Sequence, residues 1–251
     1  MAEPLLQLDR VSKRFGGLLA LDQVLFAAET GRITALIGPN GAGKTTLFSI
    51  ITGFQRPTAG VVVYDGSDIT GSSPHKLARR GLARTFQIVQ PFARLTVREN
   101  IAVGSHLHCP ARHDALAAAA KVAEAVGLGG QFDRPVEALT VAGRKRLELA
   151  RALAIEPRLL LLDEVLAGLN PSEVRDMVPV IRAIADRGVT IVMIEHVMQA
   201  VISLAEHVFV LSQGRIIAEG SPQRIASDAR VVEAYLGRGA AQRMTAGPAN
   251  D

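Results

Sequence analysis

The sequence predicts an α/β fold built on a mainly parallel central sheet, with an N-terminal antiparallel β layer and a small helical subdomain. Short runs of Val, Ile and Leu alternate with longer segments of helical period, as in parallel strands joined by helices. Three early strand-like segments, residues 5–11, 24–28 and 61–64, predict the antiparallel layer. The chain has 251 residues, 48% hydrophobic and 21% charged, which suits one large domain, alone or with a small subdomain.

The central sheet is predicted from five apolar runs of strand length. They cover residues 33–37, 82–86, 159–163, 190–194 and 208–211. Runs that are apolar at consecutive positions are typical of parallel strands buried on both faces. Gly214 then predicts a hairpin into residues 215–219.

Capping residues mark two helix starts. Thr96 and Glu99 stand at the spacing of a capping box. Asn170 is followed by Pro171, at the first helical position, and by Glu173, which can reach back to the cap. We therefore expect a helix after each of these caps.

The helical subdomain is expected at roughly residues 88–157. Helical runs at residues 114–126 and 143–154 flank residues 127–140, whose Gly and Pro content predicts a loop.

The end of the chain differs in composition from the rest. Residues 238–251 are rich in Gly, Ala and polar types without periodicity, so we expect a disordered tail there. Residues 1–237 would then form the folded domain.

Composition and charge argue against several functional classes. The single cysteine, Cys109, excludes an intramolecular disulfide framework. A net charge of +4 without a long basic run, and an aromatic content of 4%, do not indicate a nucleic-acid surface. Glu3, Asp9 and Arg10 interrupt any signal-peptide core, and no apolar run approaches the ~18 residues of a membrane span. We expect a cytoplasmic protein that meets a membrane only through a partner.

The most specific motif is a Gly-rich segment between a predicted strand and a helix. It has the sequence Gly38-Pro39-Asn40-Gly41-Ala42-Gly43-Lys44-Thr45. In such a P-loop, backbone N–H groups surround phosphate oxygens, the lysine reaches the β and γ phosphates, and the hydroxyl serves Mg²⁺. We expect these residues and the adjoining Thr46 to bind a nucleotide. The alternative, a purely structural Gly-rich turn, accounts less well for an eight-residue match in this context.

Two adjacent carboxylates, Asp163 and Glu164, end the apolar run at residues 159–163. A buried strand explains the leucines but not two acids at its carboxyl end, where open α/β sheets bind ligands. In a P-loop NTPase the first acid holds Mg²⁺ and the next can orient and deprotonate the attacking water. We therefore expect Asp163 to be a metal ligand and Glu164 a catalytic residue, with a solvated strand-end pair as the alternative.

The sequence favours ATP over GTP. Residues 68–71 superficially fit a GTPase switch pattern, but the guanine-reading motif Asn-Lys-x-Asp does not occur. ATP and Mg²⁺ are the expected cofactors.

With these motifs in this order, the chain resembles the ATPase subunits of ABC transporters over residues 4–237. The resemblance implies a P-loop NTPase of the ABC ATPase type. It also implies that Phe15 stacks on adenine, that Gln87 contacts Mg²⁺ and the lytic water, and that His196 contacts the γ-phosphate. Without the resemblance, Phe15 would be an ordinary apolar residue between strands and Gln87 would indicate no function. A single histidine at a strand end, such as His196, more often has a structural role than a functional one.

The family signature, usually written LSGGQ, corresponds to Leu139-Thr140-Val141-Ala142-Gly143. Thr140 keeps a hydroxyl and Ala142 is small, whereas Val141 adds a β-branched side chain and Gly143 removes the Gln amide. The resemblance implies that these residues meet the ATP held by a second subunit. It also places Ala167-Gly168-Leu169-Asn170 in a loop that crosses the dimer interface, with Asn170 where Asp is commonest.

Within this family, the chain is most similar to one of the two ATPases of branched-chain amino-acid importers. The strings that carry the resemblance are Arg84-Thr85-Phe86-Gln87 and residues 95–100, 146–148, 167–171 and 232–237. The resemblance implies a heterodimer with a second ATPase subunit, two membrane permease subunits and an extracytoplasmic solute-binding protein. It places the chain at the cytoplasmic face of the inner membrane, held there by the permease, with no nucleic-acid partner.

Two alternatives stay open. The cargo could be urea, short amides or another small polar solute, because permease and binding protein select it. The chain could instead be a soluble ABC ATPase acting in translation or DNA repair. Such proteins usually join two ATPase domains or carry a long coiled-coil insertion, whereas this chain has one P-loop and a short inter-motif region.

Two side-chain clusters invite other interpretations. A zinc site could be built from His106, His108, Cys109 and His113, but a polar loop fits better because a second ligand pair is missing. A surface facing solvent or a subunit explains the arginines better than nucleic acid does; these are Arg79, Arg80, Arg84, Arg94 and Arg98.

The segment at residues 87–100 is a candidate for coupling to a membrane subunit. Phe92 and Leu95 could line a groove that receives a short helix from the permease. The alternative is that they pack within the helical subdomain, since apolar residues near a capping box often form a staple.

Overall fold

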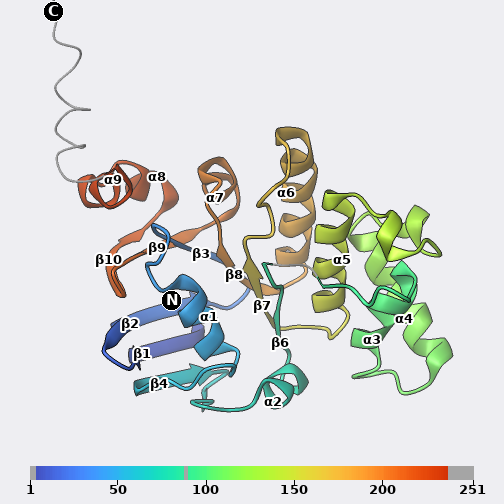
Figure 1. Ribbon diagram of the computed structural model, residues 1–251, viewed down its shortest axis with the longest axis horizontal. Helices are drawn as coiled ribbons and strands as arrows, with labels where there is room; N and C mark the ends of the chain where they lie inside the picture. Colours follow the sequence, from blue (N-terminus) through green and yellow to red (C-terminus); the bar gives the residue numbers. More distant parts are fainter. Residues whose placement is uncertain (1–3, 88–89, 237–251) are drawn as a thin grey trace, which may run out of the picture.

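Six strands form the central sheet of the computed structural model, which describes residues 4–87 and 90–236. The strand order is β10-β9-β3-β8-β7-β6 (Figure 1). The strands β6, β7, β8, β3 and β9 pair in parallel, and β10 pairs antiparallel with β9. Their bounds are β3 (Ile33–Ile37), β6 (Leu82–Arg84), β7 (Leu159–Asp163), β8 (Thr190–Ile194), β9 (His207–Ser212) and β10 (Arg215–Gly220).

The bounds predicted for β3, β7 and β8 are confirmed, whereas the predicted strand at 82–86 is two residues too long. The N–H of Thr85 still donates to the Leu161 carbonyl oxygen of β7 at 2.9 Å, and the backbone leaves β7 after this residue. The N–H of Phe86 donates to the Glu148 carboxylate at 3.2 Å instead of to a neighbouring strand. A buried side chain therefore ends β6 and starts the segment that carries Gln87.

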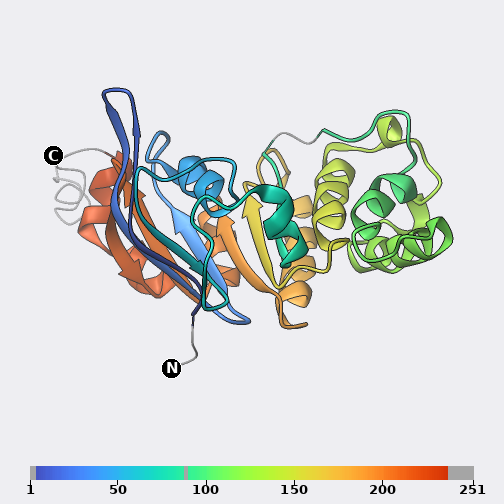
Figure 2. The same ribbon diagram turned by 90° about the horizontal axis from the view of Figure 1, so that it is seen from below.

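A four-stranded antiparallel sheet forms the N-terminal layer, in the order β2-β1-β4-β5. Its strands are β1 (Pro4–Phe15), β2 (Leu18–Glu29), β4 (Ala59–Tyr64) and β5 (Ser67–Asp68). The first two are longer than predicted, because register shifts in the β1–β2 pair break the simple alternation of apolar and polar residues. Figure 2 shows this hairpin extending beyond the neighbouring strands. Phe15 is the last residue of β1, directly before the turn to β2.

Nine α-helices lie in the described part of the chain, and both predicted caps are confirmed. Thr96 and Asn170 each form a complete capping box. Two short 3₁₀ helices, η1 (Gly129–Gln131) and η2 (Val136–Ala138), lie in the predicted loop. The α-helices are α1 (Lys44–Ile51), α2 (Pro74–Arg79), α3 (Val97–Ser105), α4 (Arg112–Ala125), α5 (Val141–Leu153), α6 (Pro171–Ala185), α7 (Met198–Leu204), α8 (Pro222–Ala226) and α9 (Ala229–Leu236).

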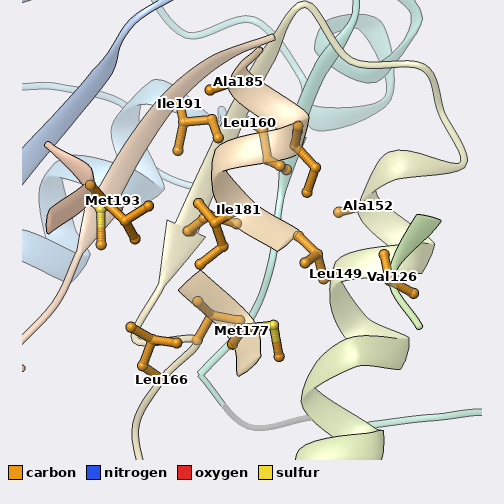
Figure 3. Close-up of a cluster of buried hydrophobic side chains, with 14 of the residues drawn as sticks. Val126, Leu149, Ala152, Leu160, Leu166, Met177, Ile181, Ala185, Ile191 and Met193 are labelled. Atoms are coloured by element: carbon orange, nitrogen blue, oxygen red, sulfur yellow. The ribbon is translucent and has the colours of Figure 1, made fainter. Parts of the chain in front are cut away.

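The central sheet has a hydrophobic core on each face. Along β7, Leu160 and Leu162 belong to one core, and Leu159 and Leu161 to the other. The first core contains the buried faces of α5 and α6, with Met177 and Ile181 beside sheet residues (Figure 3). The second contains α1 and the antiparallel layer. Burial on both faces explains why β3, β7 and β8 are apolar at nearly every position.

Helices α3, α4 and α5 lie together at one end of the molecule (Figure 1). They occupy the range predicted for the helical subdomain, whose boundaries at roughly 88 and 157 stay a prediction. The predicted tail at 238–251 lies outside the described residues. Among the helices of the described ranges, none combines the length and apolar character required to cross a membrane.

Candidate nucleotide site

The P-loop connects β3 to α1 and contains two glycines, Gly38 and Gly43, at which a side chain would clash with a neighbouring strand. Gly38 has φ 149°, and a Cβ there would lie 1.9 Å from the carbonyl oxygen of Leu211. Gly43 has φ 108°, and its Cβ would lie 2.7 Å from the carbonyl oxygen of Ala20. The backbone can therefore pass close to β9 and β2 and still open directly into α1.

Lys44 folds back into the loop from the first turn of α1. Its Nζ donates to the carbonyl oxygens of Gly38 at 2.7 Å and Pro39 at 3.0 Å. Burial lowers the pKa of this ammonium, while the charges of Glu164 and Asp163 act in the opposite direction. The cation and the N-terminus of α1 together form an anion-binding site.

Glu164 is held between the two side chains that the family resemblance assigns to hydrolysis. Gln87 Nε2 donates to Glu164 Oε2 at 2.7 Å, and His196 Nε2 lies 2.8 Å from Glu164 Oε1. Three segments far apart in the sequence thus meet at one carboxylate. The arrangement can orient the carboxylate for proton abstraction from a water molecule.

A cavity of about 890 Å³ collects most of the predicted site residues. Phe15 lies among the residues that line it, at the end of β1, and Glu164 and His196 follow β7 and β8. The P-loop contributes Asn40 to Thr46. The full lining comprises Phe15, Leu18, Leu19, Ala20, Asn40, Gly41, Ala42, Gly43, Lys44, Thr45, Thr46, Gln87, Glu164, His196, Gln213 and Gly214.

Asp163 lies beside this cavity and lines a neighbouring one of about 680 Å³. Thr45 and Gln87 line both cavities, so all three predicted metal ligands line the 680 Å³ cavity. Asp163 Oδ2 accepts a hydrogen bond from Arg84, and the Asp163 N–H donates to Thr85 Oγ1 at 3.0 Å.

The signature segment lies apart from the cavity that contains Lys44. Thr140 is the N-cap of α5 and accepts from the N–H of Gly143 at 3.1 Å, while the Val141 side chain is 58% exposed. Thr140, Val141, Ala142 and Gly143 are absent from the lining of that cavity. Asn170 uses its side chain to cap α6, accepting from the N–H groups of Ser172 and Glu173.

Three residues near the site were not predicted from the sequence to have a role in it. Arg84 binds Asp163, Lys145 contacts the main chain of Gln87 and Glu164, and Glu195 accepts from the N–H of Leu166 at 2.9 Å. Burial raises the pKa of Glu195 to about 7, against hydrogen bonds from the Leu166 and His196 N–H groups. The contacts of Arg84, Lys145 and Glu195 join segments that are far apart in the sequence, so no local pattern signals them.

The interpretations of the histidine cluster and of the arginine cluster agree with the structure to different extents. His106 Nδ1 and His108 Nε2 bond to the backbone carbonyls of Cys109 and Ile155, as expected of a polar loop. Within 4–87 and 90–236, no three or more His, Cys, Asp or Glu side chains are grouped so that they could hold one metal ion. The surface interpretation is wrong for Arg84, which is buried.

Comparisons with known proteins agree on one family. A family model described as "ABC transporter" matches residues 21–167, and one described as "Branched-chain amino acid ATP-binding cassette transporter" matches residues 215–241. The high-affinity branched-chain amino acid transport ATP-binding protein BraF of Pseudomonas aeruginosa is 40% identical, over 94% of this chain and 99% of that protein. The corresponding LivG of Escherichia coli K12 is 38% identical with the same coverage.

Solved structures give the same result. Two crystal structures of an ATP-binding cassette from an ABC transporter, one nucleotide-free and one in the ADP conformation, each match with a TM-score of 0.86. Each is 32% identical to this chain, and the match spans 94% of this chain and 100% of the solved chain. These matches confirm the fold class and the ABC ATPase resemblance inferred from the motifs. The chain therefore belongs to the ATP-binding proteins of ABC transporters, the ATPases of that family.

Proposed function

We propose that the chain is the ATP-hydrolysing subunit that powers import of branched-chain amino acids through a membrane ABC transporter. The observation that carries hydrolysis is Glu164, held by Gln87 and His196 at the cavity that contains the P-loop. The branched-chain amino acid transport named for BraF and LivG, and the matching family model at residues 215–241, support the cargo.

In this proposal the nucleotide lies along the cavity from Phe15 to the P-loop. Phe15 stacks on the adenine, Lys44 and the N–H groups of the P-loop bind the phosphates, and His196 contacts the γ-phosphate. Glu164 orients the attacking water and accepts its proton.

Mg²⁺ fits the oxygen atoms that adjoin the phosphate end of the cavity. A threonine hydroxyl, an amide oxygen and a carboxylate are hard ligands of the kind that Mg²⁺ prefers, here from Thr45, Gln87 and Asp163. The ion would neutralise charge on the phosphates. Arg84 shares Asp163, so one carboxylate oxygen is already bound to a cation.

The proposal includes four kinds of partner. A second ATPase subunit closes a heterodimer against Thr140, Val141, Ala142 and Gly143. The complex contains two permease subunits, one of which docks at the 680 Å³ cavity of this chain, whose lining includes the exposed residues Phe54, Phe86 and Val103. An extracytoplasmic protein supplies the solute, and the chain lies at the cytoplasmic face of the inner membrane.

The experiment is uptake by the complex that co-purifies with the tagged chain from membranes. Reconstituted into vesicles with ATP and a solute-binding protein, the complex should accumulate labelled leucine, isoleucine or valine. Labelled urea and a short amide serve as alternative cargoes. Accumulation of urea or the short amide instead of the amino acids would show that this solute is the cargo. A chain recovered without any permease would contradict the transport role.

A further inference from the structure

Lys145 lies on α5 and contacts two segments of the hydrolytic site at once. Its Nζ donates to the backbone carbonyl oxygens of Gln87 at 3.3 Å and of Glu164 at 3.1 Å. The side chains of these same two residues are joined at 2.7 Å. One ammonium therefore fixes the main-chain separation of a pair whose side chains also meet.

The environment of Lys145 differs from that of a surface lysine. The residue is 8% exposed, and within the described ranges it forms no ion pair. Burial raises the pKa of Glu148 and Glu195, and the charge of Lys145 acts against both shifts. Burying an ammonium costs free energy. A buried lysine that contacts two carbonyl groups at this place therefore needs a structural or functional reason.

Glu164 supplies part of that explanation through its backbone. It has φ 50°, in the left-handed region that non-glycine residues rarely adopt. Its N–H donates to the Ile194 carbonyl at 2.9 Å, and its carbonyl oxygen accepts from Lys145. Hydrogen bonds on both sides of this residue thus hold a backbone conformation that costs free energy.

Two further residues on the same face of α5 hold the segment that follows β6. Glu148 accepts from the N–H of Phe86 at 3.2 Å, and Arg151 donates to the carbonyl oxygen of Gln90 at 3.0 Å. Lys145, Glu148 and Arg151 are spaced by three residues, so they lie along one side of the helix. Contacts on both sides of Gln87 thus come from α5.

We propose that Lys145 is a positioning residue, which sets the distance between Gln87 and Glu164 and so links the orientation of α5 to the geometry of hydrolysis. The inference rests on the proposed function. Because α5 begins at the signature residues Thr140 to Gly143, a movement of that end relative to the strands shifts Lys145 against both carbonyl groups. Lys145 then acts through Glu164 and Gln87 without touching nucleotide.

The first test compares Lys145→Met and Lys145→Arg with Lys121→Met, an exposed lysine on α4, in the purified transporter complex. Lys145→Met should lower kcat by about 10- to 100-fold, because small displacements of catalytic groups have effects of this size. The KM for ATP should stay within about twofold, and Lys145→Arg should restore most of kcat because it keeps donors and charge. Lys121→Met should behave as the unaltered chain. If Lys145→Met does not fold, Lys145→Gln, which keeps one donor group, replaces it.

The second test needs no hydrolysis. Amide hydrogen exchange of the full chain should become faster in Lys145→Met for peptides that contain Phe86 and Glu164, and should be unchanged in Lys121→Met. Unchanged exchange at both places, or a kcat within about twofold of the unaltered complex, would overturn the role of Lys145. An inactive unaltered complex would instead count against the proposed function, while the exchange comparison still decides the role of Lys145.

Discussion

Arg84 donates from Nη2 to Oδ2 of Asp163 at 2.7 Å, and the two side chains are 7% and 3% exposed. The other terminal nitrogen, Nη1, lies 3.3 Å from Ser49 Oγ and 3.5 Å from Thr52 Oγ1, at the end of α1 and just beyond it. The guanidinium also lies over the ring of Phe86, 5.4 Å from its centroid. A single buried cation thus ties the P-loop helix to the acidic end of β7.

Arg84→Met should therefore destabilise the chain strongly. The substitution leaves the Asp163 carboxylate buried beside an apolar side chain, which typically costs about 3–5 kcal/mol. Urea unfolding measures the loss, with Arg79→Met on the exposed side of α2 as the matched control. Asp163→Asn in the Arg84→Met background should recover part of the stability, since it removes the unpaired charge. A loss below about 1 kcal/mol in Arg84→Met would show that the pair is dispensable.

The position of Arg84 shows where sequence reasoning reaches its limit. Its partner Asp163 is 79 residues away, so nothing local separates this arginine from its exposed neighbours. The same holds for Lys145 and Glu195, whose contacts depend on how α5 and the loops after β7 and β8 meet.

The central strands were predictable for the opposite reason. Burial on both faces makes β3, β7 and β8 apolar at nearly every position, a signal contained within five residues. The strands β1 and β2 were underestimated because irregular register hides their period. The P-loop and the acidic pair were recognisable because their chemistry requires adjacent residues.

Glu195 should give the stability of the chain a distinct pH dependence. Its folded-state pKa of about 7 lies above the ordinary value of 4.5. The folded state therefore favours the protonated form of Glu195. The stability that this preference adds to the fold is fully present below about pH 4.5 and is lost as pH rises through about 7. The difference between the two pKa values corresponds to a change of about 3 kcal/mol in the free energy of unfolding.

Glu195→Gln should flatten that profile and raise stability above about pH 7, because a neutral amide can still accept from Leu166. Urea unfolding from about pH 5 to about pH 8 measures the difference, with the exposed Glu219→Gln on β10 as control. A variant whose profile is parallel to that of the unaltered chain would mean that Glu195 titrates normally.

Phe92 tests the predicted coupling segment. Its side chain is 44% exposed, and its ring centroid lies 5.0 Å from the guanidinium of Arg151. Phe92→Ala should lower the stability of the isolated chain by less than the about 3 kcal/mol of a core phenylalanine and leave ATP binding intact. Its affinity for the permease should fall, measured by membrane recruitment beside thermal unfolding.

The control for Phe92 is Ile202→Ala, a similarly exposed apolar residue on α7. It should change neither recruitment nor ATP binding. A large stability loss in Phe92→Ala with unchanged permease affinity would assign Phe92 to packing within the helical subdomain.

Glu164→Gln in the assembled transporter tests the central claim, hydrolysis by a carboxylate held between Gln87 and His196. The amide keeps the size of the side chain and can still accept from Gln87, but it cannot take a proton from water. Single-turnover hydrolysis should therefore fall by about 10²–10⁴-fold while the dissociation constant for ATP changes little, and the exposed Glu156→Gln should match the unaltered complex. Single-turnover hydrolysis at the unaltered rate in Glu164→Gln, with ATP bound, would contradict the assignment.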